Sequence, residues 1–106
     1  MFVGRDSTNM GNAVEPRNPS FVQNAAMLYA QTQWWLPAHQ HFANLRGMVA
    51  LDGATLDMAA LAGRKLGYMA MQRGDRSEAR TYYLQSLEYR DNASVRQMLA
   101  RLENTL

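Results

Sequence analysis

Residues 60–93 read ALAGRKLGYMAMQRGDRSEARTYYLQSLEYRDNA. Gly74 divides this stretch into two segments, and in each segment apolar residues recur at three- and four-residue steps, which is the spacing of one face of an α-helix. The first segment carries Gly67, where two backbones can approach closely, and the second carries Ala79 and Tyr83 on one face. The stretch therefore predicts an antiparallel pair of helices.

The preceding part of the chain shows the same helical spacing twice. Asn18 followed by Pro19 is a helix-start signal, because Asn caps free N–H groups and Pro is tolerated at the first helical position. Apolar residues then recur to about Gln33. A second helix is expected from Pro37 to near Gly53.

The rest of the chain completes an all-helical pattern. A third helix is expected to begin at or after Thr55 and to run to Arg73. Asp75 with Glu78 fits a capping pair at the start of a fourth helix, which ends near Arg90. A last helix runs to about residue 105. Small residues form the expected packing face of the third helix: Ala59, Gly63, Leu66, Gly67 and Ala70. Five helices without a strand signal predict an all-α fold.

Size and composition indicate one helical domain, residues 19–106, in a chain of 106 residues. Residues 1–18 show no period and are interpreted as an N-terminal arm. The sequence contains no cysteine, which excludes a disulfide framework and a thiolate metal site. No metal set and no cofactor motif is recognised.

We find no membrane span and no signal peptide, so a cytoplasmic location is the default expectation, and a mature exported fragment stays open as the alternative.

Charge disfavours nucleic acid as the partner. The formal net charge is only +2, and the basic residues near the central turn alternate with Asp75 and Glu78, as on a solvated helix face. A basic-surface nucleic-acid site is kept as a minor alternative, on Arg64, Lys65, Arg73, Arg76 and Arg80.

Residues 60–93 resemble a tetratricopeptide repeat, a helix–turn–helix unit of about 34 residues. Leu66 and Gly67 match the Leu-Gly pair of that family, Ala79 matches its alanine, and Tyr83 matches the aromatic residue four positions later. The family pattern has an aromatic residue, a tyrosine, a second alanine and a proline at four positions where this chain has Gly63, Ala70, Ser86 and Asp91.

A weaker copy of the pattern covers residues 19–52. Ala26 completes an alanine pair at the Leu-Gly position, Tyr29 stands at the tyrosine, Ala38 at the alanine and Phe42 at the aromatic residue. Residues 53–59 are extra between the copies and either lengthen the third helix or form a loop. Residues 94–106 then resemble a capping helix. The resemblance implies antiparallel hairpins stacked as a short right-handed solenoid, and a different all-α bundle is the rival fold.

Repeats of this family receive a peptide or a partner's helix on the concave face of their first helices. Carried over position by position, the resemblance implies a groove formed by Gln23, Met27, Gln31, Arg64, Tyr68, Met71 and Gln72. Tyr68 stands where an asparagine is expected in the members that clamp a terminal carboxylate, so that subtype is disfavoured. The alternative is that this face is solvated or covered by the N-terminal arm.

The sequence thus favours a non-enzymatic scaffold, adaptor or chaperone that binds another protein. No catalytic constellation is recognised. The family suggests bacterial secretion or pilus assembly as a setting. A self-associating structural module, a dimer or an arm-exchanged oligomer, is the alternative, because two repeats and a cap are short of the roughly three repeats that a stable array needs.

Two aromatic pairs have competing interpretations. His39 and His41 are two residues apart, so they point away from each other on a helix, which favours a polar surface position or half-buried packing over metal binding. Trp34 and Trp35 either stack a ligand or fill a helix–helix junction, and the second is favoured.

Overall fold

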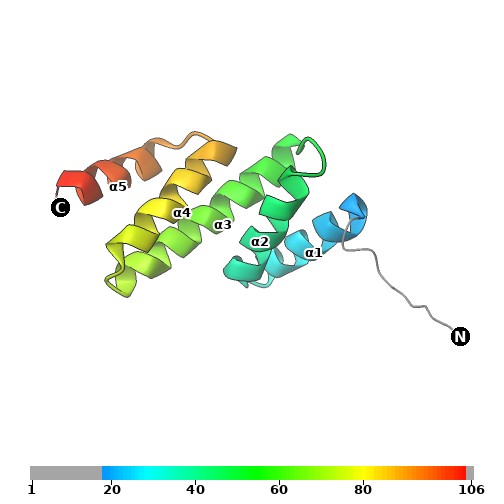
Figure 1. Ribbon diagram of the computed structural model, residues 1–106, viewed down its shortest axis with the longest axis horizontal. Coiled ribbons are helices and arrows are strands. Elements are labelled where there is room, and N and C mark those ends of the chain that lie inside the picture. Colours follow the sequence, from blue (N-terminus) through cyan, green and yellow to red (C-terminus); the bar gives the residue numbers. More distant parts are fainter. Residues whose placement is uncertain (1–17, 105–106) are drawn as a thin grey trace, which may run out of the picture.

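The computed structural model describes residues 18–104 (Figure 1). The predicted arm, apart from Asn18, and the last two residues lie outside this range. Five helices occur within it: α1 (Pro19–Gln31), α2 (Trp35–Arg46), α3 (Gly53–Gln72), α4 (Arg76–Tyr89) and α5 (Ala93–Asn104). No strand occurs among these residues, so the all-α prediction of about five helices is confirmed. None of the described helices is both long enough and apolar enough to cross a bilayer.

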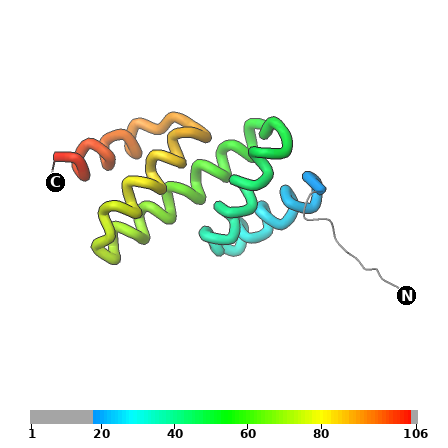
Figure 2. Tube along the Cα trace, viewed as in Figure 1, coloured from blue at the N-terminus to red at the C-terminus, as the bar shows by residue number. Residues whose placement is uncertain are grey.

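The helices succeed one another along the molecule (Figure 2). Each helix packs against the next helix in sequence, and α1 also reaches α3. We call α1 with α2 the first hairpin and α3 with α4 the second hairpin. The helix α5 packs against α4 at the C-terminal end of the structure (Figure 1).

Side-chain caps fix where most helices start. The Asn18 side chain accepts hydrogen bonds from the backbone N–H groups of Ser20 and Phe21, at 2.9 and 3.3 Å. Asp75 Oδ1 accepts the N–H of Glu78 at 3.0 Å. The carboxylate of Glu78 pairs with Arg73 and does not reach back to the cap residue. Only the aspartate half of the predicted capping pair is therefore formed.

Two helix boundaries differ from the prediction. The helix α2 begins at Trp35 and ends at Arg46, so it starts two residues earlier than expected and stops well before Gly53. The third helix starts at Gly53 because Asp52 Oδ1 accepts the N–H of Thr55 at 2.8 Å, which is an N-cap. Residues 53–59 therefore lengthen α3, one of the two possibilities left open by the sequence.

The two hairpin turns repeat the same hydrogen bonds 41 positions apart. Trp34 N–H donates to Tyr29 O at 2.8 Å, and Asp75 N–H donates to Ala70 O at 2.9 Å. The residue before each donor has a positive φ, 64° at Gln33 and 81° at Gly74. This Schellman-type closure of a helix end gives both hairpins the same turn. The structure thus contains an internal repeat in the register expected from sequence.

The buried side chains form two clusters. The first lies between the hairpins and includes Phe42, Ala59, Ala62 and Tyr89. The second lies between the second hairpin and α5 and includes Tyr83. Because α3 and α4 contribute to both clusters, the second hairpin connects the two halves of the core.

The closest helix–helix approach is at Gly67. A Cβ built on Gly67 would lie 2.6 Å from the ring of Tyr83, so only glycine allows the two helices to pack this closely here. One turn earlier, Gly63 lies against Ser86, whose hydroxyl donates to Ala60 O at 2.7 Å. The close approach predicted from Gly67 and Tyr83 is found, and it brings the Tyr83 ring to the centre of the second hairpin.

Candidate functional site

A groove lies between α3 and α5, with α4 beneath it. It consists of two adjacent hollows of about 440 and 330 Å³, which share Tyr68, Tyr83 and Met98. The first hollow is completed by Arg64, Lys65, Ser94 and Val95, and the second by Met71, Arg76, Arg101 and Leu102. We call this surface the α3–α5 groove.

The close packing at Gly67 determines the floor of the groove. Tyr83 is 1% exposed because its ring fills the space that a side chain at position 67 would occupy. Tyr68, one residue later on α3, is 52% exposed beside it. The groove therefore combines a buried ring with an accessible one, and the flexible side chains of Met71 and Met98 can adapt to an irregular ligand surface.

The rim of the groove is basic. Arg64, Lys65, Arg76 and Arg101 line it, and no acidic side chain is among its lining residues. Within residues 18–104, neither Arg64 nor Lys65 forms an ion pair, whereas Arg80 pairs with Glu103 at 3.4 Å outside the groove. The local field of the groove therefore favours a ligand that carries carboxylates.

The Tyr83 hydroxyl is a buried donor without a hydrogen-bond partner among the described residues. Burial raises the pKa of Tyr83, and the neighbouring Tyr68 phenol raises it further. A buried hydroxyl that forms no hydrogen bond is unfavourable by about 1–3 kcal/mol. The oxygen is buried, so it offers no accessible donor to a ligand in the groove.

The residues predicted from sequence fall into two groups. Arg64, Tyr68 and Met71 line the α3–α5 groove, whereas Gln72 is exposed outside its lining. The three predicted residues of α1 lie elsewhere: Gln23 donates to Thr55 Oγ1 at 3.3 Å, Met27 packs against the first core cluster and Gln31 is exposed. The groove lining brings together only the part of the predicted surface contributed by α3.

Sequence reasoning missed the wall of the groove formed by α5. The sequence assigns no residue of the last helix to the binding surface, and it assigns Lys65 only to the nucleic-acid alternative. The order of the helices could have indicated this wall. A capping helix that follows the second hairpin and packs on it must flank the outer face of α3.

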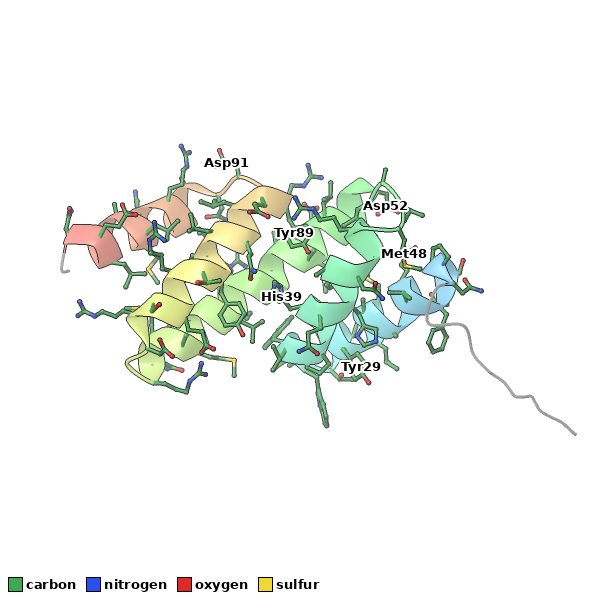
Figure 3. All side chains as sticks on the ribbon, viewed as in Figure 1. Tyr29, His39, Met48, Asp52, Tyr89 and Asp91 are labelled. Carbon is green, nitrogen blue, oxygen red and sulfur yellow. The ribbon has the colours of Figure 1, made fainter. Side chains whose placement is uncertain are left out.

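The two histidines contact different helices. His39 Nε2 lies 3.0 Å from Gln85 Oε1 of α4, and the His39 ring meets Tyr82 edge-on at 5.5 Å (Figure 3). His41 Nδ1 donates to Pro37 O at 2.8 Å, and its ring lies 5.3 Å from that of Tyr29 on α1. Burial lowers the pKa of His39, and the Gln85 hydrogen bond opposes this shift. Within residues 18–104, no three His, Asp or Glu side chains come together in a way that would hold a metal ion.

Of the two tryptophans, only Trp35 lies against the core. It is half-buried on the first cluster, whereas Trp34 is 63% exposed. The expected filling of a helix junction is therefore wrong for Trp34.

Comparisons with protein-family models, with curated proteins and with solved structures find no match to this chain.

Proposed function

We propose that this chain is a non-enzymatic protein-binding module, similar in plan to tetratricopeptide-repeat scaffolds, and that its α3–α5 groove binds an acidic segment of a partner protein. The observation that carries the proposal is the combination of an apolar floor with a rim of four cations and no acid. A segment with two apolar anchors flanked by Asp or Glu complements both properties.

The two hollows suit a short helix or an extended peptide. A helix in a groove inserts apolar side chains at three-, four- and seven-residue steps. Tyr68 and Met98 stand between the two hollows, so one anchor on each side of them would fill both.

The test starts from a displayed peptide library of random sequence, selected on the full chain. We expect the selected peptides to be rich in Asp and Glu around apolar residues. In fluorescence anisotropy, Met71→Glu and Arg64→Glu should each weaken the binding of a selected peptide at least about tenfold, equivalent to about 1.4 kcal/mol. Tyr68→Ala should weaken it with little loss of stability, because the ring is half exposed.

Arg46→Gln provides the matched control, because Arg46 pairs with Glu88 outside the groove at 3.0 Å. Its peptide affinity should equal that of the wild-type chain. Selected peptides that are basic, or affinities that ignore both Met71→Glu and Arg64→Glu, would exclude this groove as the binding site.

The same assay with labelled oligonucleotides addresses the nucleic-acid alternative. Three of its five cations, Arg64, Lys65 and Arg76, line the groove. Oligonucleotide binding that is tight at physiological salt and falls steeply with added salt would favour that alternative.

A further inference from the structure

The first hairpin contains no charged residue before Arg46, the last residue of α2. Residues 18–45 contain no Asp, Glu, Lys or Arg, although several of their side chains face solvent. Exposed faces of helices normally carry charged residues. Charged residues are instead depleted in the buried centres of protein–protein interfaces, where aromatic residues are enriched. The composition of this hairpin therefore resembles that of an interface.

One edge of the hairpin also exposes large apolar side chains. Phe21 and Leu28 are seven residues apart, on one face of α1, and they are 45% and 60% exposed. Trp34 continues this surface, because its ring lies 6.4 Å from that of Tyr29 in the last turn of α1. Figure 3 labels Tyr29. We call Phe21, Ala25, Leu28 and Trp34 the α1 edge.

The internal repeat places two residues of the α1 edge at stacking positions. Shifted by 41 residues, Phe21 and Ala25 correspond to Ala62 and Leu66 of α3. Those two residues are 0% and 6% exposed, and Ala62 packs in the first core cluster with residues of α2. The equivalent positions of α1 have no helix in front of them among the described residues. Phe21 and Ala25 thus occupy positions that receive a neighbouring helix in the second hairpin. Leu28 and Trp34 correspond to Met69 and Asp75, which are exposed, so these two extend the apolar surface beyond the repeated contact.

We propose that the α1 edge is the interface of a homodimer, in which the α1 edges of two copies pack on each other about a two-fold axis. Such an interface brings the same surface of both copies together. A face without charge meets its own copy without like-charge repulsion. Head-to-tail stacking is disfavoured, because the exposed side chains of α5 include Arg96, Arg101 and Glu103 but no large apolar residue.

The exposed area is consistent with a modest dimer. With whole large side chains at roughly 150–250 Å², the exposed fractions of Phe21, Leu28 and Trp34 correspond to about 350 Å² of apolar surface per copy. A standard interface buries about 800 Å² per partner. The three side chains would supply nearly half of that area, and the uncharged residues around them would supply the rest.

The test is the mass of the full chain in solution, measured by sedimentation equilibrium from about 1 to 100 μM, the range for a micromolar dimer. We expect a monomer–dimer equilibrium for the wild-type chain. Leu28→Glu and Phe21→Glu should each weaken the dimer at least about 100-fold, because each substitution places two carboxylates in one symmetric interface. Circular dichroism should show unchanged helicity, because both positions are substantially exposed.

Leu84→Glu is the matched control. Leu84 is 38% exposed on α4, away from the α1 edge, so this variant should dimerise like the wild-type chain. A wild-type chain that remains monomeric at 100 μM would overturn the proposal, and this is also the outcome if residues 1–17 cover the edge within one chain. A dimer that Leu28→Glu and Phe21→Glu both leave intact would overturn it too. Peptide binding by Leu28→Glu separates this result from the fate of the α3–α5 groove.

Discussion

At the scale of single residues, the repeat pattern and the structure both predict that removing the Tyr83 hydroxyl stabilises the folded chain. Its counterpart in the first hairpin, 41 residues earlier, is Phe42, which is buried without a hydroxyl. Tyr83→Phe removes a donor that has no partner within the described residues, so we expect the free energy of unfolding to rise by about 1 kcal/mol. Urea denaturation followed by circular dichroism measures the change.

Tyr89→Phe is the opposite case. Tyr89 is also buried, but its ring lies 5.1 Å from the Arg46 guanidinium and its hydroxyl interacts with that group. The same substitution should therefore lower stability at this site. A loss of stability in Tyr83→Phe, comparable to that in Tyr89→Phe, would show that the Tyr83 hydroxyl does have a partner.

His39 makes stability depend on pH. Burial lowers the pKa of His39 in the folded chain below its ordinary value of 6.5, so the unfolded chain binds a proton more readily. The slope of unfolding free energy against pH is positive wherever the unfolded state holds more protons. The stability contributed by neutral, buried His39 is therefore complete above pH 6.5. It is lost as the pH falls from 6.5 towards the lowered pKa of His39 in the folded chain.

His39→Gln should flatten the pH dependence of unfolding between pH 7 and 5, since no imidazole remains to titrate near its ordinary pKa of about 6.5. The His41→Gln variant should keep the wild-type slope if His39 is its source. Urea midpoints at several pH values measure both. Equal slopes in the wild-type chain and in His39→Gln would contradict the assignment.

The side-chain pairings show why residue-level prediction succeeded in one place and failed in another. Gly67 and Tyr83 can be matched from sequence, because a repeat pattern fixes which small residue faces which large one. The partner of His39 is Gln85, in another hairpin. Nothing in the spacing of His39 and His41 indicates that contact, and so the partner of His39 could not be predicted.

At the scale of elements, the repeated turn gives the next prediction. Gly74 has a φ of 81°, and no atom lies within 4 Å of a Cβ added there, so only backbone strain opposes a side chain. Gly74→Ala should lower the free energy of unfolding by about 1–2 kcal/mol. Gln33 occupies the same place in the first hairpin with a φ of 64°. Gln33→Gly should give a gain of less than about 1 kcal/mol, because glycine also loses more entropy on folding.

Thermal unfolding of the two variants and the wild-type chain measures these effects. Gly47→Ala serves as a control for adding a methyl group, since Gly47 has an ordinary helical φ of −75° and a Cβ there makes only a normal contact. If Gly74→Ala lowers the free energy of unfolding no more than Gly47→Ala does, the second turn does not depend on the positive φ of Gly74.

Helix boundaries could be predicted where a side-chain cap marks them. Asn18 and Asp75 were recognised as caps, and both accept the expected backbone hydrogen bonds. Asp52 forms the same kind of cap but was assigned to the end of the preceding helix, so α3 was started too late. The stop of α2 at Arg46 could not be predicted, because the apolar spacing continues to Val49, which is 41% exposed after the helix has ended.

At the scale of the whole molecule, charge separates two surfaces with different proposed roles. The uncharged α1 edge belongs to α1 and the turn after it, whereas α5 contributes one wall of the basic groove. Figure 1 shows α1 and α5 at opposite ends of the described chain. The all-α architecture followed from periodicity alone. The groove as found did not, because it needs the placement of α5 beside α3, which depends on packing between residues far apart in sequence.

The second hairpin should couple these two ends during unfolding, because its helices belong to both core clusters. Val95 is 1% exposed in the second cluster, so Val95→Ala should lower the free energy of unfolding by about 2 kcal/mol. Both tryptophans, Trp34 and Trp35, lie in the first hairpin. Tryptophan fluorescence therefore reports on the first hairpin, whereas circular dichroism reports on all the helices.

If the core unfolds as one unit, Val95→Ala should shift the fluorescence and circular dichroism midpoints by the same amount, although it lies in α5 and both fluorophores lie in the first hairpin. Leu84→Ala, at an exposed position of α4, should move either midpoint by no more than about 0.5 kcal/mol. In a stack whose units contact only their neighbours, the two ends can unfold separately. In that case Val95→Ala would leave the fluorescence midpoint unchanged and would lower the circular dichroism midpoint. Because α3 contributes Ala59 and Ala62 to one cluster and Ala70 to the other, melting the second cluster removes the support of the first, and the two transitions should coincide.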